Sequence, residues 1–188
     1  HLSKNSKIST LRRRLVSISM VHKMKGHYLD TKHPIIVENL MGIRRVIGSI
    51  QRGKKPILIN HLKLIIDTIN QQKTEEIKKL RDKSLILVGF GGGFRRTELV
   101  SIDYQDLEFV PEGLKITIKK SKTDQFGEGM IKGLPYFTSD NYCPVKNLNK
   151  WLEISKIKSG PIFRRFSKGL SLTNKRLTDQ SVVLLIKK

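Results

Sequence analysis

Apolar side chains recur every three or four residues in two stretches near the start of the chain, as they do along one face of a helix. The first stretch covers residues 6–25, and its apolar positions are Ile8, Leu11, Leu15, Ile18 and Val21. The second begins at Pro34, a residue favoured in the first turn of a helix. Its inner positions are expected at Val37, Leu40, Met41 and Ile47. These positions predict two helices before the chain becomes polar.

The same periodicity predicts further helices in the rest of the chain. The first follows Asn60, a suitable N-cap. Its inward positions are expected at Leu62, Ile65, Ile66 and Ile69. Another starts near Thr74, where two carboxylates favour a first turn. The others are a short helix near Arg95, a longer one over residues 144–157 and a last one from about Thr178.

An alternating pattern replaces the helical one in the middle of the second half. Leu114, Ile116 and Ile118 alternate with polar residues, which indicates a half-buried strand. The turn-rich residues 124–129 lead to a return strand that begins at Met130. Together these patterns predict a mainly α fold with a small antiparallel β-sheet, which is an α+β arrangement.

The chain is strongly basic, with 37 Lys and Arg against 16 Asp and Glu and a net charge of +21. Residues 1–55 hold 13 of these bases and 2 of the acids, whereas residues 56–188 hold 24 and 14. Such an excess favours a polyanionic partner, because each phosphate that is neutralised releases a condensed counterion. We therefore expect double-stranded DNA as the partner. The alternatives are a solvated basic surface and an RNA partner, although no aromatic-rich RNA motif occurs.

The distribution of charge and of polar residues suggests two domains. The first two helices form a small, very basic module, and the polar residues 51–56 have the composition of a linker. We expect a partial helical DNA-clamp domain over residues 1–52 and a larger domain over residues 53–188. The alternative is a basic helical pair that only packs on its neighbour. Both ends of the chain are expected to be cuts, since the last helical pattern has no stop signal.

Other features of the composition limit the classes of function. The single cysteine, Cys143, excludes an internal disulfide and a cysteine-based zinc site, and no two histidines have metal-ligand spacing with a carboxylate. No apolar run reaches the ~20 residues that cross a bilayer, and no secretory signal is visible. We expect a cytoplasmic protein with no metal, no cofactor and no membrane partner.

A glycine-rich stretch at residues 89–93 precedes two adjacent arginines, Arg95 and Arg96. A dinucleotide-binding turn would need glycine at position 94, which is Phe94, and no βαβ pattern surrounds it. The glycines are better explained as a sharp turn that brings Arg95 close to a phosphate, which a guanidinium binds through two oxygens. An ordinary surface pair of Arg95 with Glu98 is the alternative.

The segment Gly93-Phe94-Arg95-Arg96-Thr97-Glu98-Leu99 resembles the first conserved box of the tyrosine recombinases, the phage-integrase family. Leu114 to Lys122 is similar to the strand pair that presents the catalytic lysine of that family, and residues 1–50 resemble the last helices of its core-binding domain. The resemblance implies that Arg95 stabilises the transition state and that Lys122 is the general acid. The DNA contacts that we expect are Arg12, Arg13, Arg14, Arg44, Arg45, Arg96, Lys119 and Lys120.

The reaction of the family is metal-free, and it starts when a tyrosine attacks a DNA phosphodiester. The chain contains no histidine after His61 and no tyrosine after Tyr142, so the family's His-x-x-Arg box and its nucleophile are not among these residues. The resemblance therefore implies a fragment that binds DNA without cleaving it, with other recombinase protomers as further partners on DNA. The alternative is a non-catalytic remnant or an architectural nucleic-acid-binding protein.

Overall fold

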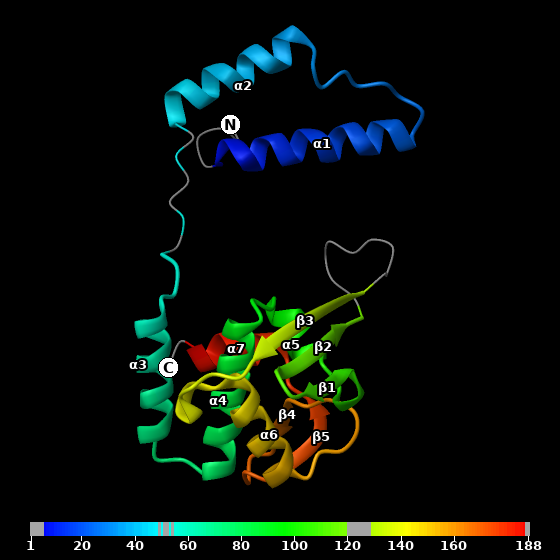
Figure 1. Cartoon of the computed structure of the whole chain (residues 1–188). Helices are drawn as coiled ribbons and strands as arrows, with labels where there is room; N and C mark the ends of the chain where they lie inside the picture. Colours follow the sequence, from blue (N-terminus) through cyan, green and yellow to red (C-terminus); the bar gives the residue numbers. More distant parts are fainter. Residues whose placement is uncertain (1–5, 49, 51–52, 54, 120–128, 187–188) are drawn as a thin grey trace. The chain divides into compact units, whose positions relative to one another are not determined.

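The computed structural model describes residues 6–48, 50, 53, 55–119 and 129–186. The chain divides into two compact units, residues 1–56 and residues 57–188 (Figure 1). The described part of the first unit contains two helices, and that of the second contains helices and two sheets. None of the helices in these ranges is both long and apolar enough to cross a membrane.

The first unit consists of α1 (Ile8–Met24) and α2 (Pro34–Ile47), which pack against each other. On α1, Ile8 is buried and Leu11 and Leu15 are half-buried, as the periodicity predicts, whereas the predicted positions Ile18 and Val21 are exposed. On α2 the half-buried residues are Ile36, Leu40 and Ile43. The predicted inner positions Val37, Met41 and Ile47 are exposed, so that prediction was wrong except at Leu40. The spacing 36, 40, 43 also follows one helical face, and packing on α1 selects it.

Two histidines lie at the starts of helices, where their rings accept hydrogen bonds from backbone N–H groups that have no partner within the helix. The ring Nδ1 of His33, the N-cap of α2, accepts from the Ile35 N–H at 3.3 Å. The ring Nδ1 of His61 accepts from the Leu58 N–H at 3.2 Å. His61 lies in the first turn of α3 (Ile59–Gln71), and the N-cap of α3 is Leu58. The prediction that Asn60 caps this helix was therefore wrong.

The second unit is built around α4 (Glu76–Gly91), which packs on α3 (Ile59–Gln71) and on α6 (Pro144–Ser155). Residues 84–88 of α4 are all buried, as expected for a helix that is covered on several sides. The short α5 (Arg96–Ser101) packs on α4 and on α7 (Asp179–Ile186). Each of these helices corresponds to one that the sequence predicts.

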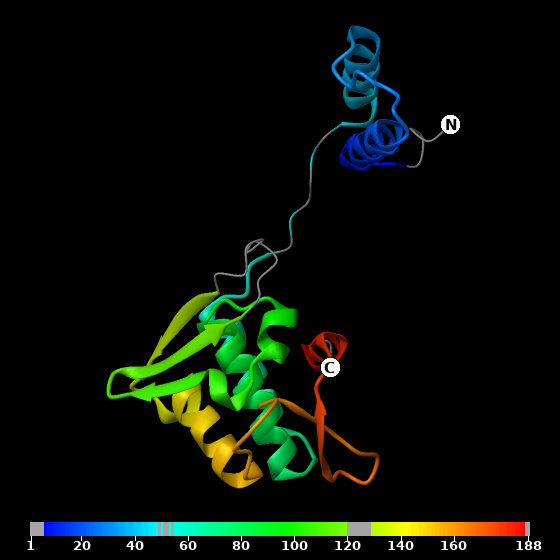
Figure 2. The same ribbon diagram turned by 90° about the vertical axis from the view of Figure 1, so that its right-hand side faces the viewer.

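Two antiparallel sheets complete the second unit, and Figure 2 shows them as separate pieces. The first has the order β1 (Leu107–Val110), β2 (Gly113–Ile118) and β3 (Met130–Pro135), and the second pairs β4 (Arg164–Phe166) with β5 (Leu172–Arg176). The 3-10 turns η2 (Tyr104–Asp106) and η3 (Asp140–Tyr142) precede β1 and α6. The predicted fold class, mainly helical with small antiparallel sheets, is confirmed.

The core of the second unit joins its helices to both sheets. Trp151 of α6 is fully buried, and its indole N–H donates to the Ile162 carbonyl oxygen at 2.8 Å. Phe163 beside it and Ile116 of β2 are also fully buried. Cys143 is also buried. Because Trp151 is the single tryptophan of the chain, its fluorescence reports the folding of this unit.

The close pairing of β2 with β3 depends on a glycine at the start of β2. An added Cβ at Gly113 would collide with the carbonyl oxygen of Leu134, whereas one at Gly133 would meet nothing within 4 Å. Gly113→Ala is expected to lower the free energy of unfolding by at least about 2 kcal/mol, because the strands must separate. Gly133→Ala, the matched control, should change it by less than about 0.5 kcal/mol. Urea titrations followed by Trp151 fluorescence measure both, and equal effects would contradict the prediction.

Candidate functional site

Arg95 lies at the turn between α4 and α5. Gly92 and Gly93 follow the last residue of α4, and Gly93 has a φ of 55°, a left-handed value that glycine adopts without strain. Arg95 is then the N-cap residue of α5. The glycines make the sharp turn that the sequence predicts. Residues 85–88 before them are helical, so the strand that a dinucleotide-binding turn requires does not exist here.

A glycine on α4 also lets α5 approach closely. A Cβ at Gly89 would lie 2.8 Å from the Cδ2 of Leu99, which would force one of the two to move. Leu99 and Val100 are buried. A helix of six residues is not stable alone, so this packing holds α5 in place. It thereby fixes the position from which Arg95 projects.

The side chain of Arg95 is held by Glu98, one turn further along α5. The Nη1 of Arg95 donates to Glu98 Oε1 at 2.7 Å, and the backbone N–H of Arg95 donates to Glu98 Oε2 at 3.0 Å. The Glu98 side chain is only 5% exposed, whereas that of Arg95 is 47% exposed. One carboxylate thus satisfies a free N–H at the helix start and orients a guanidinium that still faces solvent.

Lys132 of β3 is the third charged group at this site. Its Nζ donates to the carbonyl oxygens of Gly92 and Gly93 at 2.9 and 3.1 Å, and it lies 4.0 Å from Glu98 Oε2. It also lies 4.5 Å from the centroid of the Phe94 ring, at cation–π distance. Sequence reasoning missed Lys132, because its partner Gly92 is 40 residues away. The one signal available in the sequence was a single basic residue within the predicted return strand.

Lys119, at the end of β2, is engaged with acidic residues. Its Nζ is 2.6 Å from Asp106 Oδ1 and 4.0 Å from Asp103 Oδ2. The hydrogen bond to Asp106 is the main cause that raises the pKa of Lys119 above its ordinary value of 10.5. Arg176 of β5 also pairs with Asp103 and donates to the Val100 carbonyl oxygen at 2.7 Å. These carboxylates compete with any phosphate for Lys119.

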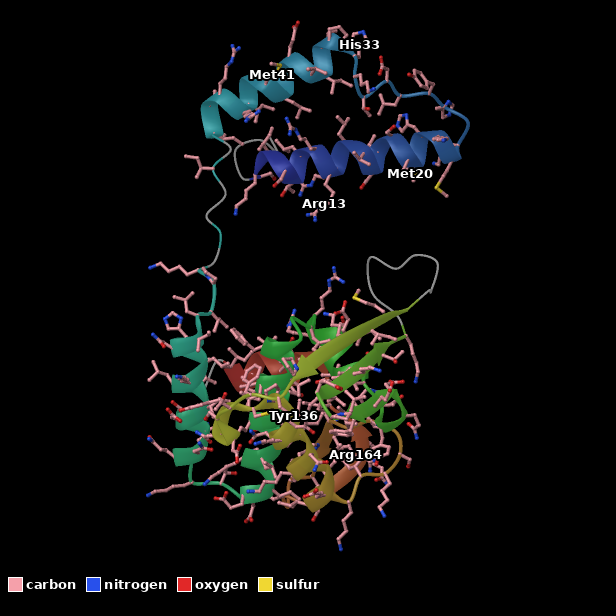
Figure 3. The ribbon with its side chains drawn as sticks, in the orientation of Figure 1. Arg13, Met20, His33, Met41, Tyr136 and Arg164 are labelled. Atoms are coloured by element: carbon pink, nitrogen blue, oxygen red, sulfur yellow. The ribbon has the colours of Figure 1, made fainter. Side chains whose placement is uncertain are left out.

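The other predicted DNA contacts lie on both units. Arg12, Arg13 and Arg14 are exposed on α1, Arg44 and Arg45 are exposed in the last turn of α2, and Arg96 is exposed at the start of α5. Figure 3 shows Arg13 pointing away from α2. Lys120 and Lys122 lie outside the described residues. Among the residues that the structure describes, it brings together Arg95, Glu98 and Lys132. All of these contacts stay predictions.

An apolar cavity of about 320 Å³ lies between α3, α4, α5 and α7, with Arg96 in its wall. The residues that line it include Leu62, Leu85, Phe90 and Val182. This lining offers few polar groups that could hold a charged cofactor. Within residues 6–48, 50, 53, 55–119 and 129–186, no three His, Cys, Asp or Glu side chains gather as a metal site would need.

The chain is similar over its whole length to a known recombinase homologue. It shares 41% identity over 190 residues with the integrase/recombinase XerD homolog of Selenomonas ruminantium. The match covers 100% of the chain and 55% of that relative, so the chain spans about half the length of the protein it matches. No protein-family model matches the chain.

Solved structures with low identity show a weaker likeness. The crystal structure of the XerA recombinase matches 92% of the chain and 57% of its own length, with 13% identity and a TM-score of 0.48. The pre-cleavage complex of the XerH site-specific recombinase with its difH substrate matches 93% of the chain and 50% of its own length. Its identity is 18% and its TM-score is 0.46.

The ion pair of Lys119 with Asp106 predicts a pH dependence of stability. Since the folded state raises the pKa of Lys119, the pair stabilises the protein below pH 10.5, and this contribution is lost as the pH rises through the raised pKa. Lys119→Met should flatten the decline of the unfolding free energy above that pH. Lys115→Met removes an exposed lysine from the same strand and serves as the control. Urea titrations at a series of alkaline pH values test this, and parallel declines in wild type and Lys119→Met would contradict it.

Proposed function

The chain belongs to the tyrosine recombinase family, and from that premise we propose that its 188 residues are a DNA-binding part of a site-specific recombinase. It is a partial-length homologue of a Xer-type recombinase. We assign residues 1–52 to the end of a core-binding domain and residues 53–188 to the N-terminal portion of a catalytic domain. The 41% identity over the whole chain supports this assignment.

The observation that carries the proposal is the fixed but half-exposed guanidinium of Arg95. Its backbone is set by the Gly92–Gly93 turn and its side chain by Glu98, while 47% of the side chain is exposed to solvent. A guanidinium presented in this way can bind two oxygens of a phosphate and stabilise the charge that develops in phosphoryl transfer. We propose that Arg95 has this role and that Lys122 is the general acid.

Duplex DNA is the proposed partner. The net charge of +21 favours a polyanion, and the exposed arginines of α1 and α2 provide phosphate contacts on the first unit. One of the solved structures that resemble the chain is that of the XerH recombinase bound to its difH substrate. Other recombinase protomers are proposed as further partners on the same DNA.

We propose that a chain of these 188 residues binds DNA without cleaving it. The covalent mechanism of the family needs a tyrosine nucleophile downstream of a histidine box, and no tyrosine follows Tyr142 here. Tyr142 itself is held by a hydrogen bond from its hydroxyl to Asp67 at 3.1 Å. The second candidate, which the net charge of +21 also supports, is a non-catalytic binding protein in which Arg95 and Lys122 only contact phosphates.

The proposal predicts a specific loss of affinity on removal of Arg95. Arg95→Ala should weaken the binding of duplex DNA about tenfold at moderate salt, because a charge-assisted contact to phosphate is lost. Fluorescence anisotropy with a labelled duplex at several salt concentrations measures it. The salt dependence should also become less steep by about one phosphate contact.

The matched control is Lys79→Ala, which removes one positive charge near the other end of α4. Lys79 lies roughly 18 Å along the helix axis from Gly91 and is paired with Glu76. Its loss should change the affinity by less than about twofold, since that end is not proposed to touch DNA. Equal losses for both variants would mean that only net charge matters, and covalent attachment to a nicked duplex would refute the proposed lack of cleavage.

A further inference from the structure

Glu98 lies between two cations that come from different parts of the second unit. Arg95, next to α5, donates to one carboxylate oxygen at 2.7 Å, and Lys132 of β3 lies 4.0 Å from the other. The carboxylate is almost completely buried. A buried carboxylate needs compensation from nearby positive charge and hydrogen bonds. Lys132 shares that compensation with Arg95.

The net charge of Arg95, Glu98 and Lys132 affects how strongly the site attracts a phosphate. Arg95 and Glu98 alone form a neutral pair, which attracts an anion only weakly. With Lys132 the three side chains carry one net positive charge. Because Lys132 is 19% exposed and its ammonium is directed at Gly92, Gly93 and Glu98, it is not itself available to DNA. The exposed member that can present the net charge is Arg95.

Lys132 also fixes the geometry of the turn before Arg95. Its two hydrogen bonds satisfy carbonyl groups of Gly92 and Gly93 at the C-terminal end of α4, where a positive charge is favourable. The same ammonium lies over the Phe94 ring. The strand that carries Lys132 follows, in sequence, the segment that contains Lys122. One side chain therefore ties that strand to the turn that presents Arg95.

We propose that Lys132 is a positioning residue for Arg95. It compensates the charge of Glu98 and holds the Gly92–Gly93 turn, so that the guanidinium of Arg95 keeps its orientation and its net attraction for a phosphate. This inference rests on the proposed function, in which Arg95 binds a DNA phosphate. It adds to that function a third residue, from β3, that acts on DNA only through Arg95.

The test is the affinity for a labelled DNA duplex, measured by anisotropy with the full 188-residue chain. Lys132→Met should weaken binding about fivefold to tenfold, close to the loss caused by Arg95→Ala. In the Arg95→Ala background, Lys132→Met should have almost no further effect, because both changes remove the same contact. Lys115→Met, an exposed lysine of the neighbouring strand, is the control and should change binding by less than about twofold.

A charge-restoring variant separates positioning from simple loss of structure. Lys132→Met combined with Glu98→Gln removes one charge of each sign, so Arg95 again carries the net positive charge. The double variant should recover part of the lost affinity, because a glutamine can accept only one of the two hydrogen bonds that Glu98 accepts from Arg95. Lys132→Arg should keep the wild-type affinity. A purely structural role of Lys132 predicts no recovery. Additive losses from Lys132→Met and Arg95→Ala, or no recovery with Glu98→Gln, would overturn the inference.

The unfolding of the same variants gives a reading that does not depend on DNA. Lys132→Met should lower the thermal midpoint because the buried carboxylate loses a compensating charge, and Glu98→Gln in that background should raise it again. If the wild-type chain fails to bind the duplex, the proposed function fails. The pairing of Lys132 with Glu98 is then judged by this unfolding cycle, and additive effects of the two changes would overturn it.

Discussion

The placement of Arg95 depends on one buried carboxylate. Glu98 accepts a hydrogen bond from the backbone of Arg95 and another from its guanidinium, so the start of α5 and the direction of the side chain are set together. α5 is only six residues long and would not form alone. Its stability comes from the contact that Gly89 allows with Leu99. The candidate site therefore exists only because the surrounding core forces a short helix into place.

That core is arranged around α4, which contacts several other elements of the second unit. Its middle residues pack against α3 and α6, and its last turn leads into the glycines before Arg95. The three-stranded sheet contributes Lys132, whose ammonium satisfies carbonyl groups at the end of α4. The sheet and the helices are thus joined at the candidate site by charge as well as by apolar packing.

The sequence was most informative where a local pattern determines the structure. The helices of the second unit, the β2 strand with its alternating Ile116 and Ile118, and the glycine turn before Arg95 all follow from spacing and composition. β1 was not predicted, because its pattern does not alternate. Its end residues, Leu107 and Val110, are half-buried, and its two middle residues, Glu108 and Phe109, are exposed. The inner face of α2 depends on packing against α1, and that choice is not contained in the periodicity of α2 alone.

The ion pairs of the site could also be predicted from the sequence only where the partners are close together along the chain. Glu98 follows Arg95 by three residues, so their pairing is visible in the sequence as one alternative. Lys132 reaches the site through the return of β3 along β2, and only the folded sheet brings it within hydrogen-bonding distance of Gly92. Lys119 was predicted as a DNA contact in the same strand pair as Lys122. Its ion pair with Asp106 depends on how β2 ends beside η2.

We propose that this chain contacts DNA through the turn that presents Arg95. Hydrogen–deuterium exchange of the chain with and without a DNA duplex tests it most directly, because it locates the contact surface without any substitution. Amides of residues 92–99 should gain protection when DNA is added. The first two turns of α4, residues 76–83, should not change. Protection of residues 76–83 without protection of residues 92–99 would contradict the claim.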